Sequence, residues 1–104
     1  MSMSAKEVLQ KAKDLLSDKS RWTTGVYRSR KEDGSECFCA AGALYKVCNG
    51  YEPGPLDYDG YAEAYDALAA ACGGSPISAN DSHEKGYDFI MAAFDRAIAK
   101  ESNT

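Results

Sequence analysis

Three cysteines and the only histidine of this 104-residue chain are the side chains that could hold a metal ion: Cys37, Cys39, Cys48 and His83. Structural zinc sites take their ligands in pairs, most often two cysteines separated by two to four residues. Cys37 and Cys39 are closer together than that, and no second pair of ligands follows them. We therefore expect no metal ion and no other cofactor, and we interpret the cysteines as reduced, buried thiols.

Cys39 also occupies a position suited to a nucleophile, because the residues after it predict the start of a helix. A thiol at a helix N-terminus has a lowered pKa, and His83 could act as its base. Such a pair needs the two side chains in contact, and nothing in the sequence brings them together. His83 lies beside acidic residues in the first turn of another expected helix, which is typical of a surface residue. A Cys39–His83 enzyme is therefore the third of our hypotheses, and we expect no catalytic residues.

Tyrosines and acidic residues alternate between Tyr51 and Cys72, a segment without lysine or arginine. Tyrosine is enriched at protein interfaces because it offers a large amphipathic area at a low entropy cost, and the acids would complement a basic partner. A catalytic carboxylate pair would need facing partners that this spacing does not show. The leading hypothesis is therefore a non-enzymatic binding protein whose partner contacts six residues: Tyr51, Tyr58, Asp59, Tyr61, Glu63 and Asp66.

A run of small residues, Ala40-Ala41-Gly42-Ala43, lets another backbone or a ligand approach the start of an expected helix. Its free N–H groups could hold a small anionic ligand that resembles a nucleotide, with charge from an arginine and a stacking face from a tryptophan. This second hypothesis assigns seven ligand-binding residues: Trp22, Gly25, Arg28, Cys39, Gly42, Asn80 and Asp81. The alternative, which we favour, is close packing of the helix start, with Asn80 or Asp81 tied to backbone near Gly25 or Gly42.

The hydrophobic periodicity predicts a mostly α fold of about four helices, with one β-hairpin between the first and the second helix. Asp33-Gly34 is a favoured hairpin turn, and it joins strands expected at 24–30 and 35–39. Val26, Phe38 or the two nearby cysteines should face the helices, and Trp22 should lie in the core. Residues 75–80 are expected to form a loop. The helices are expected at 5–17, at 40–48, from 59 or 60 to 72, and from a cap at Asp81 to about residue 100.

Length and composition indicate one globular domain over residues 1–104. Lysine and arginine outnumber the acids by five in residues 1–31, and the acids outnumber them by nine in residues 32–104, which gives the net charge of −4. This acidity disfavours nucleic acid as a partner, although the basic first third could contact an anion. No apolar run is long enough for a membrane span and no leader opens the chain, so we expect a cytoplasmic protein without membrane contact. A homo-oligomer is compatible with these features.

Short motifs of the chain resemble those of a family of small bacterial and phage proteins, a domain of unknown function. The matching residues are Trp22-x-x-Gly25, Cys39-Ala-x-Gly42-Ala43-Leu44, Asn80-Asp81 and, near the end of the last helix, Asp95-Arg96-Ala97-Ile98. The family pattern has a tryptophan before Asn-Asp, where this chain has Ala79. If that tryptophan formed a ligand wall, the wall is missing here. If it served packing, another side chain must fill the space.

The resemblance implies no activity. It does imply a phage or mobile-element origin, and small acidic proteins of such origin often act by binding components of the host. With this origin, the leading hypothesis becomes a phage-encoded protein that modulates a host protein in the host cytoplasm.

Overall fold

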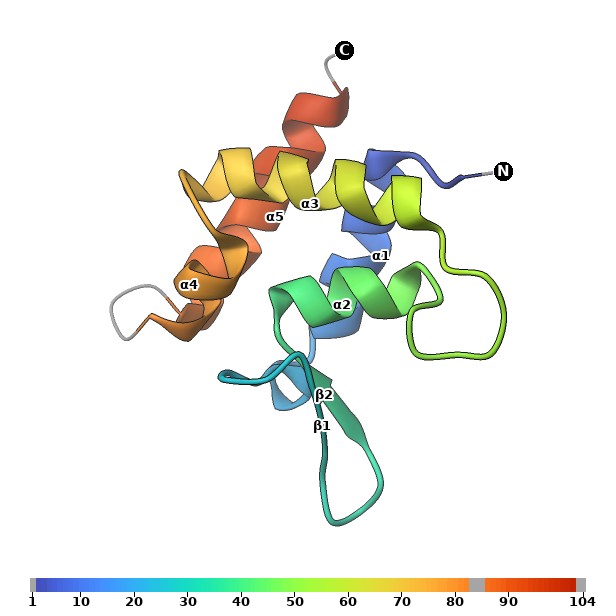
Figure 1. Ribbon diagram of the computed structural model, residues 1–104. Coiled ribbons are helices and arrows are strands. Elements are labelled where there is room, and N and C mark those ends of the chain that lie inside the picture. Colours follow the sequence, from blue (N-terminus) through green and yellow to red (C-terminus); the bar gives the residue numbers. More distant parts are fainter. Residues whose placement is uncertain (1, 83–85, 103–104) are drawn as a thin grey trace.

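The computed structural model describes residues 2–82 and 86–102 of the chain (Figure 1). It confirms the predicted mostly helical fold, with a hairpin between the first two α-helices. The elements, in chain order, are α1 Ala5–Leu16, the 3-10 helix η1 Lys19–Arg21, β1 Arg28–Arg30, β2 Glu36–Phe38, α2 Ala40–Val47, α3 Tyr58–Cys72, α4 Pro76–Asp81 and α5 Gly86–Ser102.

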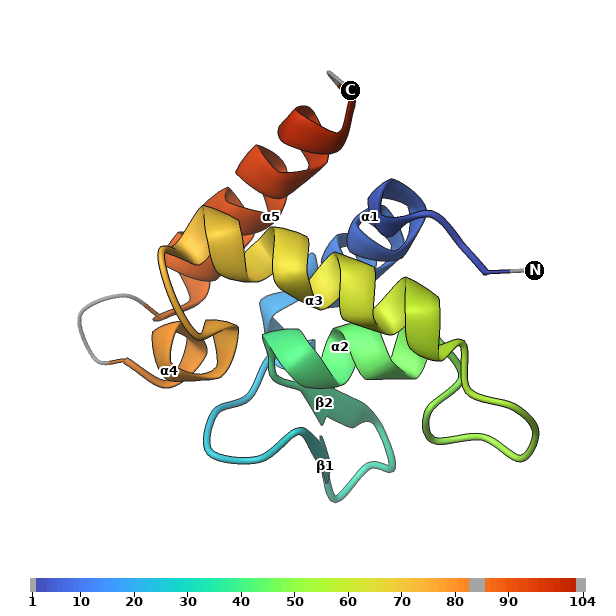
Figure 2. The ribbon, with the colours of Figure 1, turned by 45° about the horizontal axis from the view of Figure 1, so that its top comes forward.

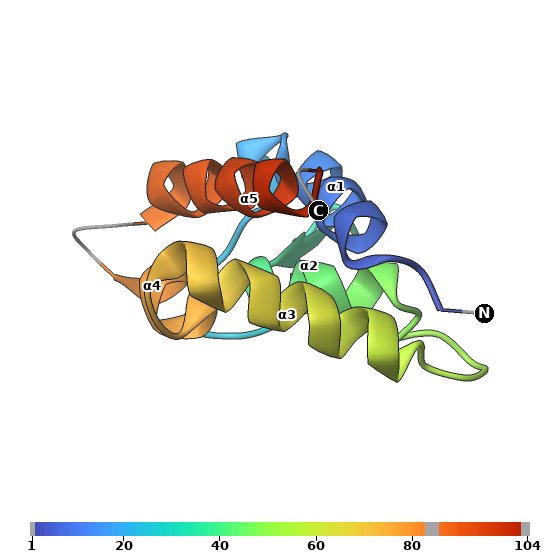
Figure 3. The same ribbon diagram turned by 90° about the horizontal axis from the view of Figure 1, so that it is seen from above.

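The helices form two layers. Seen from above, α1 and α5 lie in one layer, and α2, α3 and α4 form the other (Figure 3). The core lies between the layers, where α1 packs against α2 and α3, and α1 also packs against α5 within its own layer. Its largest fully buried apolar side chains include Leu9 and Leu16 of α1, Leu44 of α2, Leu68 of α3, and Ile90 and Phe94 of α5. Within the described residues, no helix combines the length and the apolar character that a bilayer crossing requires.

The hairpin lies against the side of α2 that faces away from α3 (Figure 2). β1 and β2 pair antiparallel, with Arg28 opposite Phe38. The hairpin is shorter than predicted because Gly25 adopts a φ of +82° and residues 24–27 bend before β1 begins. Phe38 and the two cysteines are buried as predicted, but Val26 is 51% exposed, so its predicted place against the helices is wrong.

Most of the loop predicted at residues 75–80 is instead the helix α4. The hydroxyl oxygen of Ser75 accepts a hydrogen bond from the backbone N–H of Ser78 at 3.3 Å, which caps the helix. Pro76 occupies the first turn, where its missing N–H costs nothing. Because α4 includes Asp81 as its last residue, Asp81 does not cap the last helix as predicted. That helix, α5, begins at Gly86.

The other predicted helix ends agree closely with the structure. Ser4 caps α1 by accepting a hydrogen bond from the N–H of Glu7, and Gly73 ends α3 with a φ of +73°. α3 begins slightly earlier than predicted, because the Asp57 side chain caps it by accepting from the N–H of Gly60.

Candidate functional site

Asn80 is fully buried and uses both ends of its side-chain amide. Its Oδ1 accepts hydrogen bonds from the indole Nε1 of Trp22 at 2.7 Å and from the backbone N–H of Ala40 at 3.0 Å. Its Nδ2 donates to the carbonyl oxygen of Thr23 and to the carboxylate of Asp81, each at 3.0 Å. Because a buried amide without partners costs free energy, these four bonds make Asn80 a tie between α4, the segment before the hairpin and the start of α2.

Asp81 adds a further link to the same segment. Its Oδ1 accepts a hydrogen bond from the backbone N–H of Gly25 at 3.1 Å. Glycine suits this position because a φ of +82° is one that other residues rarely adopt. The predicted tie is therefore confirmed: Asp81 bonds Gly25 itself, and Asn80 bonds Ala40, two residues before Gly42.

The start of α2 packs closely on the backbone that precedes β1. A Cβ atom added to Gly42 would lie 1.9 Å from the carbonyl oxygen of Tyr27. The Sγ of Cys39 accepts a hydrogen bond from the N–H of Gly42 at 3.3 Å, and the N–H of Ala40 is bonded to Asn80. Two of the N–H groups that an anion would need are thus already bonded within the protein, which supports close packing over a ligand at this turn.

The charged contacts of Arg28 are made with residues outside the other six of the ligand hypothesis. Its guanidinium group forms an ion pair with Glu36 on β2, and this contact holds the pKa of the Glu36 carboxyl below its ordinary value. The same guanidinium lies over the ring of Tyr51, 4.8 Å from the centroid. Its charge is therefore engaged within the hairpin and the adjoining loop.

The cysteines are buried thiols without a disulfide. Burial raises the pKa of the Cys39 thiol, which is the opposite of the shift that a nucleophile at a helix start requires. Burial also raises the pKa of Cys48, to about 11. Within residues 2–82 and 86–102, no group of three or more metal-binding side chains comes together. His83 lies outside the described residues, so the structure does not place the Cys39–His83 pair.

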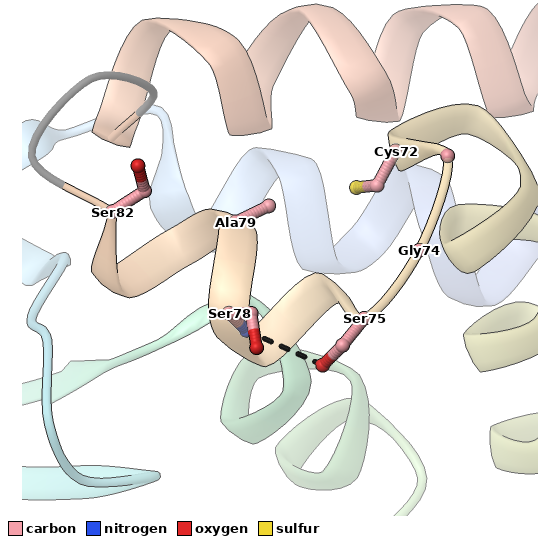
Figure 4. Close-up of a pocket in the computed structure, with 7 residues that line it drawn as sticks. Cys72, Gly74, Ser75, Ser78, Ala79 and Ser82 are labelled. Atoms are coloured by element: carbon pink, nitrogen blue, oxygen red, sulfur yellow. Dashed lines mark hydrogen bonds between the residues drawn. The ribbon is translucent and has the colours of Figure 1, made fainter.

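A polar pocket of about 290 Å³ lies between the end of α3 and α4 (Figure 4). Its lining carries serine hydroxyl groups and no charged side chain, and it consists of Cys72, Gly73, Gly74, Ser75, Ser78, Ala79 and Ser82. Ala79, the residue directly before Asn80, lies in this lining between Cys72 and Ser82 (Figure 4). Ala79 itself is buried and packs in the core, so it contributes little surface to this pocket.

Most of the predicted partner-binding residues lie on the exposed side of α3. Tyr58 is 66% exposed, and Asp59, Glu63 and Asp66 are exposed as well. Because residues three and four apart are neighbours on a helix, the three acids share one side of it. Next to them is a hollow of about 220 Å³, lined by Tyr58, Tyr61, Ala62, Tyr65 and Asp66.

Tyr51 and Tyr61 belong to an aromatic cluster around Tyr45. The ring centroid of Tyr45 lies 5.1 Å from that of Tyr51 and 5.4 Å from that of Tyr61, both in edge-to-face contacts. The phenolic oxygen of Tyr51 is buried and has no hydrogen-bond partner among the described residues. Burial raises the pKa of Tyr61 to about 12. Tyr51 thus packs in the aromatic cluster and does not line the hollow, whereas Tyr61 does both.

The sequence did not reveal that Val26 and Tyr27 belong to the surface, where each is 51% exposed. The signal that could have found them is Gly25. A glycine directly before these residues indicates a turn of the chain, so that they need not follow the alternation of the strand.

Comparison with known proteins gives a match that spans nearly the whole chain. Residues 1–100 match the model of a family described as a family of unknown function (DUF6197). No curated protein and no solved structure matches the chain. The family match carries no statement about activity, so the function has to be inferred from the geometry.

Proposed function

From the premise that this chain belongs to DUF6197, a family of unknown function, we propose that it is a non-enzymatic binding protein that docks a positively charged segment of a partner protein on α3. The single observation that carries this proposal is a hollow lined by tyrosines beside three exposed acids. We call this area the α3 surface and define it by Tyr58, Asp59, Tyr61, Glu63, Tyr65 and Asp66.

The acids of the α3 surface have charge available for a partner. Among the residues that the structure describes, no ion pair uses Asp59, Glu63 or Asp66. Carboxylates that form no ion pair within the protein attract a basic partner and raise its rate of association. The tyrosine rings supply contact area. A lysine or arginine of the partner would therefore meet the acids, and an apolar group beside it would enter the hollow.

The proposed partner is a protein of the host cell. This part of the proposal rests on the resemblance to phage proteins, which favours a phage or mobile-element origin and action in the host cytoplasm. The charge of −4 supports a protein partner over nucleic acid, because phosphate groups would be repelled by the α3 surface.

Partner capture from host lysate tests the proposal. The variant Tyr58→Ala/Asp59→Lys/Glu63→Lys should lose the captured protein, while its unfolding free energy changes by no more than about 0.5 kcal/mol per exposed substitution. Asp14→Lys/Asp88→Lys is the control, because it makes the same change of charge at exposed acids of α1 and α5. A photo-crosslinking residue at position 58 should label the captured protein, and one at the exposed position 92 should not. Equal capture by the triple variant and the unchanged protein would reject the α3 surface.

The alternative function, a small anionic ligand held at the start of α2, has less support. The N–H groups of Ala40 and Gly42 are bonded to Asn80 and Cys39. A thermal-shift screen against nucleotides separates the two functions, since a ligand at 100 times its Kd adds about 2.7 kcal/mol of stability. A clear shift that Gly25→Ala or Trp22→Phe abolishes would favour the ligand.

A further inference from the structure

A groove of about 590 Å³ lies on the other side of the acids of α3. It is bordered by the N-terminal end of α1, by α3 and by the C-terminal end of α5, and Figure 3 looks on to the edge of the molecule where these parts meet. Its volume falls within the range of sites that hold ligands. The α3 surface accounts for only two of its lining residues, Glu63 and Asp66.

The apolar part of the groove consists of small side chains, those of Ala5, Ala67 and Ala70. Alanine lets another backbone approach closely, and it leaves a smooth surface on which the ridges of a helix can lie. A compact small molecule would need several polar groups that converge on it from an enclosed cavity. This open groove with alanines along it suits a further helix better.

The rim of the groove is acidic. Glu63, Asp66 and Glu101 bring three negative charges, and Lys100 brings one positive charge. Asp66 also lines the tyrosine hollow, so the groove and the hollow lie on either side of this residue of α3. An occupant that complements both needs positive charge along its length and an apolar side toward the alanines.

We propose that the groove binds a cationic amphipathic helix of the partner protein. Its small apolar side chains lie on Ala67 and Ala70, and its lysine or arginine residues face the rim. This inference rests on the proposed function and specifies its partner: the docking segment is helical, basic and long enough to cross α3 from the tyrosine hollow to the end of α5. An acidic segment would be repelled by the rim, as would nucleic acid.

A synthetic helical peptide is the probe, with alanine and leucine on one side and lysine on the other. At low salt it should shift the backbone NMR signals of Ala67, Ala70 and Glu101 in the ¹⁵N-labelled full chain. A peptide of the same composition in scrambled order keeps the charge but loses the apolar side. Its affinity for the protein should therefore be lower by roughly tenfold or more. Raising the salt from about 0.01 M to about 1 M should weaken both peptides, because it shortens the screening length from about 30 Å to about 3 Å.

Ala70→Trp tests the shape of the groove without removing an acid. Ala70 is exposed on α3, so a large side chain there fills the groove and leaves the core intact. Ala92→Trp is the matched control at an exposed position of α5 outside the groove. Ala70→Trp should weaken peptide binding roughly tenfold or more, Ala92→Trp should leave it unchanged, and both should melt at the temperature of the unchanged protein.

If Ala70→Trp and the unchanged protein bind the peptide with equal affinity, the groove is not the binding site. Peptide binding without NMR shifts at Ala67 and Ala70 would lead to the same conclusion. Binding that is weakened by Tyr58→Ala and unchanged by Ala70→Trp would reject the groove and keep the α3 surface as the binding site. A peptide that does not bind at all also rejects the helical occupant. In that case the capture experiment with the triple variant still decides the proposed function by itself.

Discussion

The indole N–H of Trp22 donates a hydrogen bond to the side-chain oxygen of Asn80, 58 positions away in the chain, at 2.7 Å. The same indole ring packs edge-to-face on Tyr87, with 5.5 Å between the ring centroids. Tyr87 in turn donates its hydroxyl to the carbonyl oxygen of Leu16 at 2.7 Å. Trp22 therefore connects α4, α5 and the end of α1, and its conformation depends on Asn80.

Removing the Asn80 side chain should destabilise the protein strongly. Asn80→Ala leaves Trp22 Nε1, the N–H of Ala40 and the carbonyl of Thr23 without this partner. Each buried group without a partner costs about 1–3 kcal/mol, so we expect a loss of about 3 kcal/mol or more. At about 4–8 °C per kcal/mol, the melting temperature should fall by more than about 10 °C in calorimetry.

Ser78→Ala, an exposed substitution on the same helix, is the control for Asn80→Ala and should be nearly neutral. Trp22 is the only tryptophan, so its fluorescence reports on the same bond. An Asn80→Ala protein that melts like the unchanged one and keeps its emission maximum would show that these hydrogen bonds contribute nothing.

Enlarging Gly42 should separate α2 from the segment before the hairpin. Gly42→Ala places a Cβ atom 1.9 Å from the Tyr27 carbonyl oxygen, and the backbone has to move to relieve the clash. Overpacking of this kind costs about 1–3 kcal/mol, which urea unfolding measures. Gly74→Ala is the control, because no atom lies within 4 Å of the new Cβ and the backbone there has no positive φ. Equal stability of the two variants would contradict the close packing.

The fold and the packing motifs were predictable because they depend on local patterns. The apolar stripe of α1, the Ser4 cap and the Gly73 stop each follow from a few neighbouring residues. The tie between Asn80 and the segment near Gly25 was expected only as one alternative, since no sequence pattern shows which distant backbone groups a buried amide meets.

The errors have physical reasons as well. The loop predicted at residues 75–80 is wrong because a serine followed by proline, as in Ser75-Pro76, also suits a helix start. Val26 is one of the alternatives predicted for the face against the helices, but the turn at Gly25 leaves it outside the strand and exposed, and Phe38 and the cysteines supply that face. The groove beside α3 could not be predicted, because it depends on where the distant ends of α1 and α5 lie.

The native thiols should react slowly with alkylating reagents. Burial raises the pKa of Cys39 and brings that of Cys48 to about 11, so at pH 8 only about one Cys48 in a thousand is a thiolate. Mass spectrometry after a short incubation with iodoacetamide should find Cys39 and Cys48 unmodified in the native protein and modified in urea. Selective modification of native Cys39 within that time would contradict this and would support the Cys39–His83 enzyme.

Asp57 should make the stability of the protein depend on acidic pH. Its carboxylate accepts hydrogen bonds from the N–H groups of Met3 at 2.9 Å and Gly60 at 3.1 Å, and these hold its pKa below the ordinary value of 3.8. Because the folded-state pKa is below the unfolded one, the stabilisation is fully present above pH 3.8 and is lost as the pH falls through the folded-state value. Asp57→Asn retains an oxygen that can cap α3 but cannot ionise, so urea unfolding from pH 7 to pH 2 should show a weaker loss for this variant. If both proteins lose stability in parallel over this range, other carboxylates govern the acid response, because only Asp57 distinguishes the two.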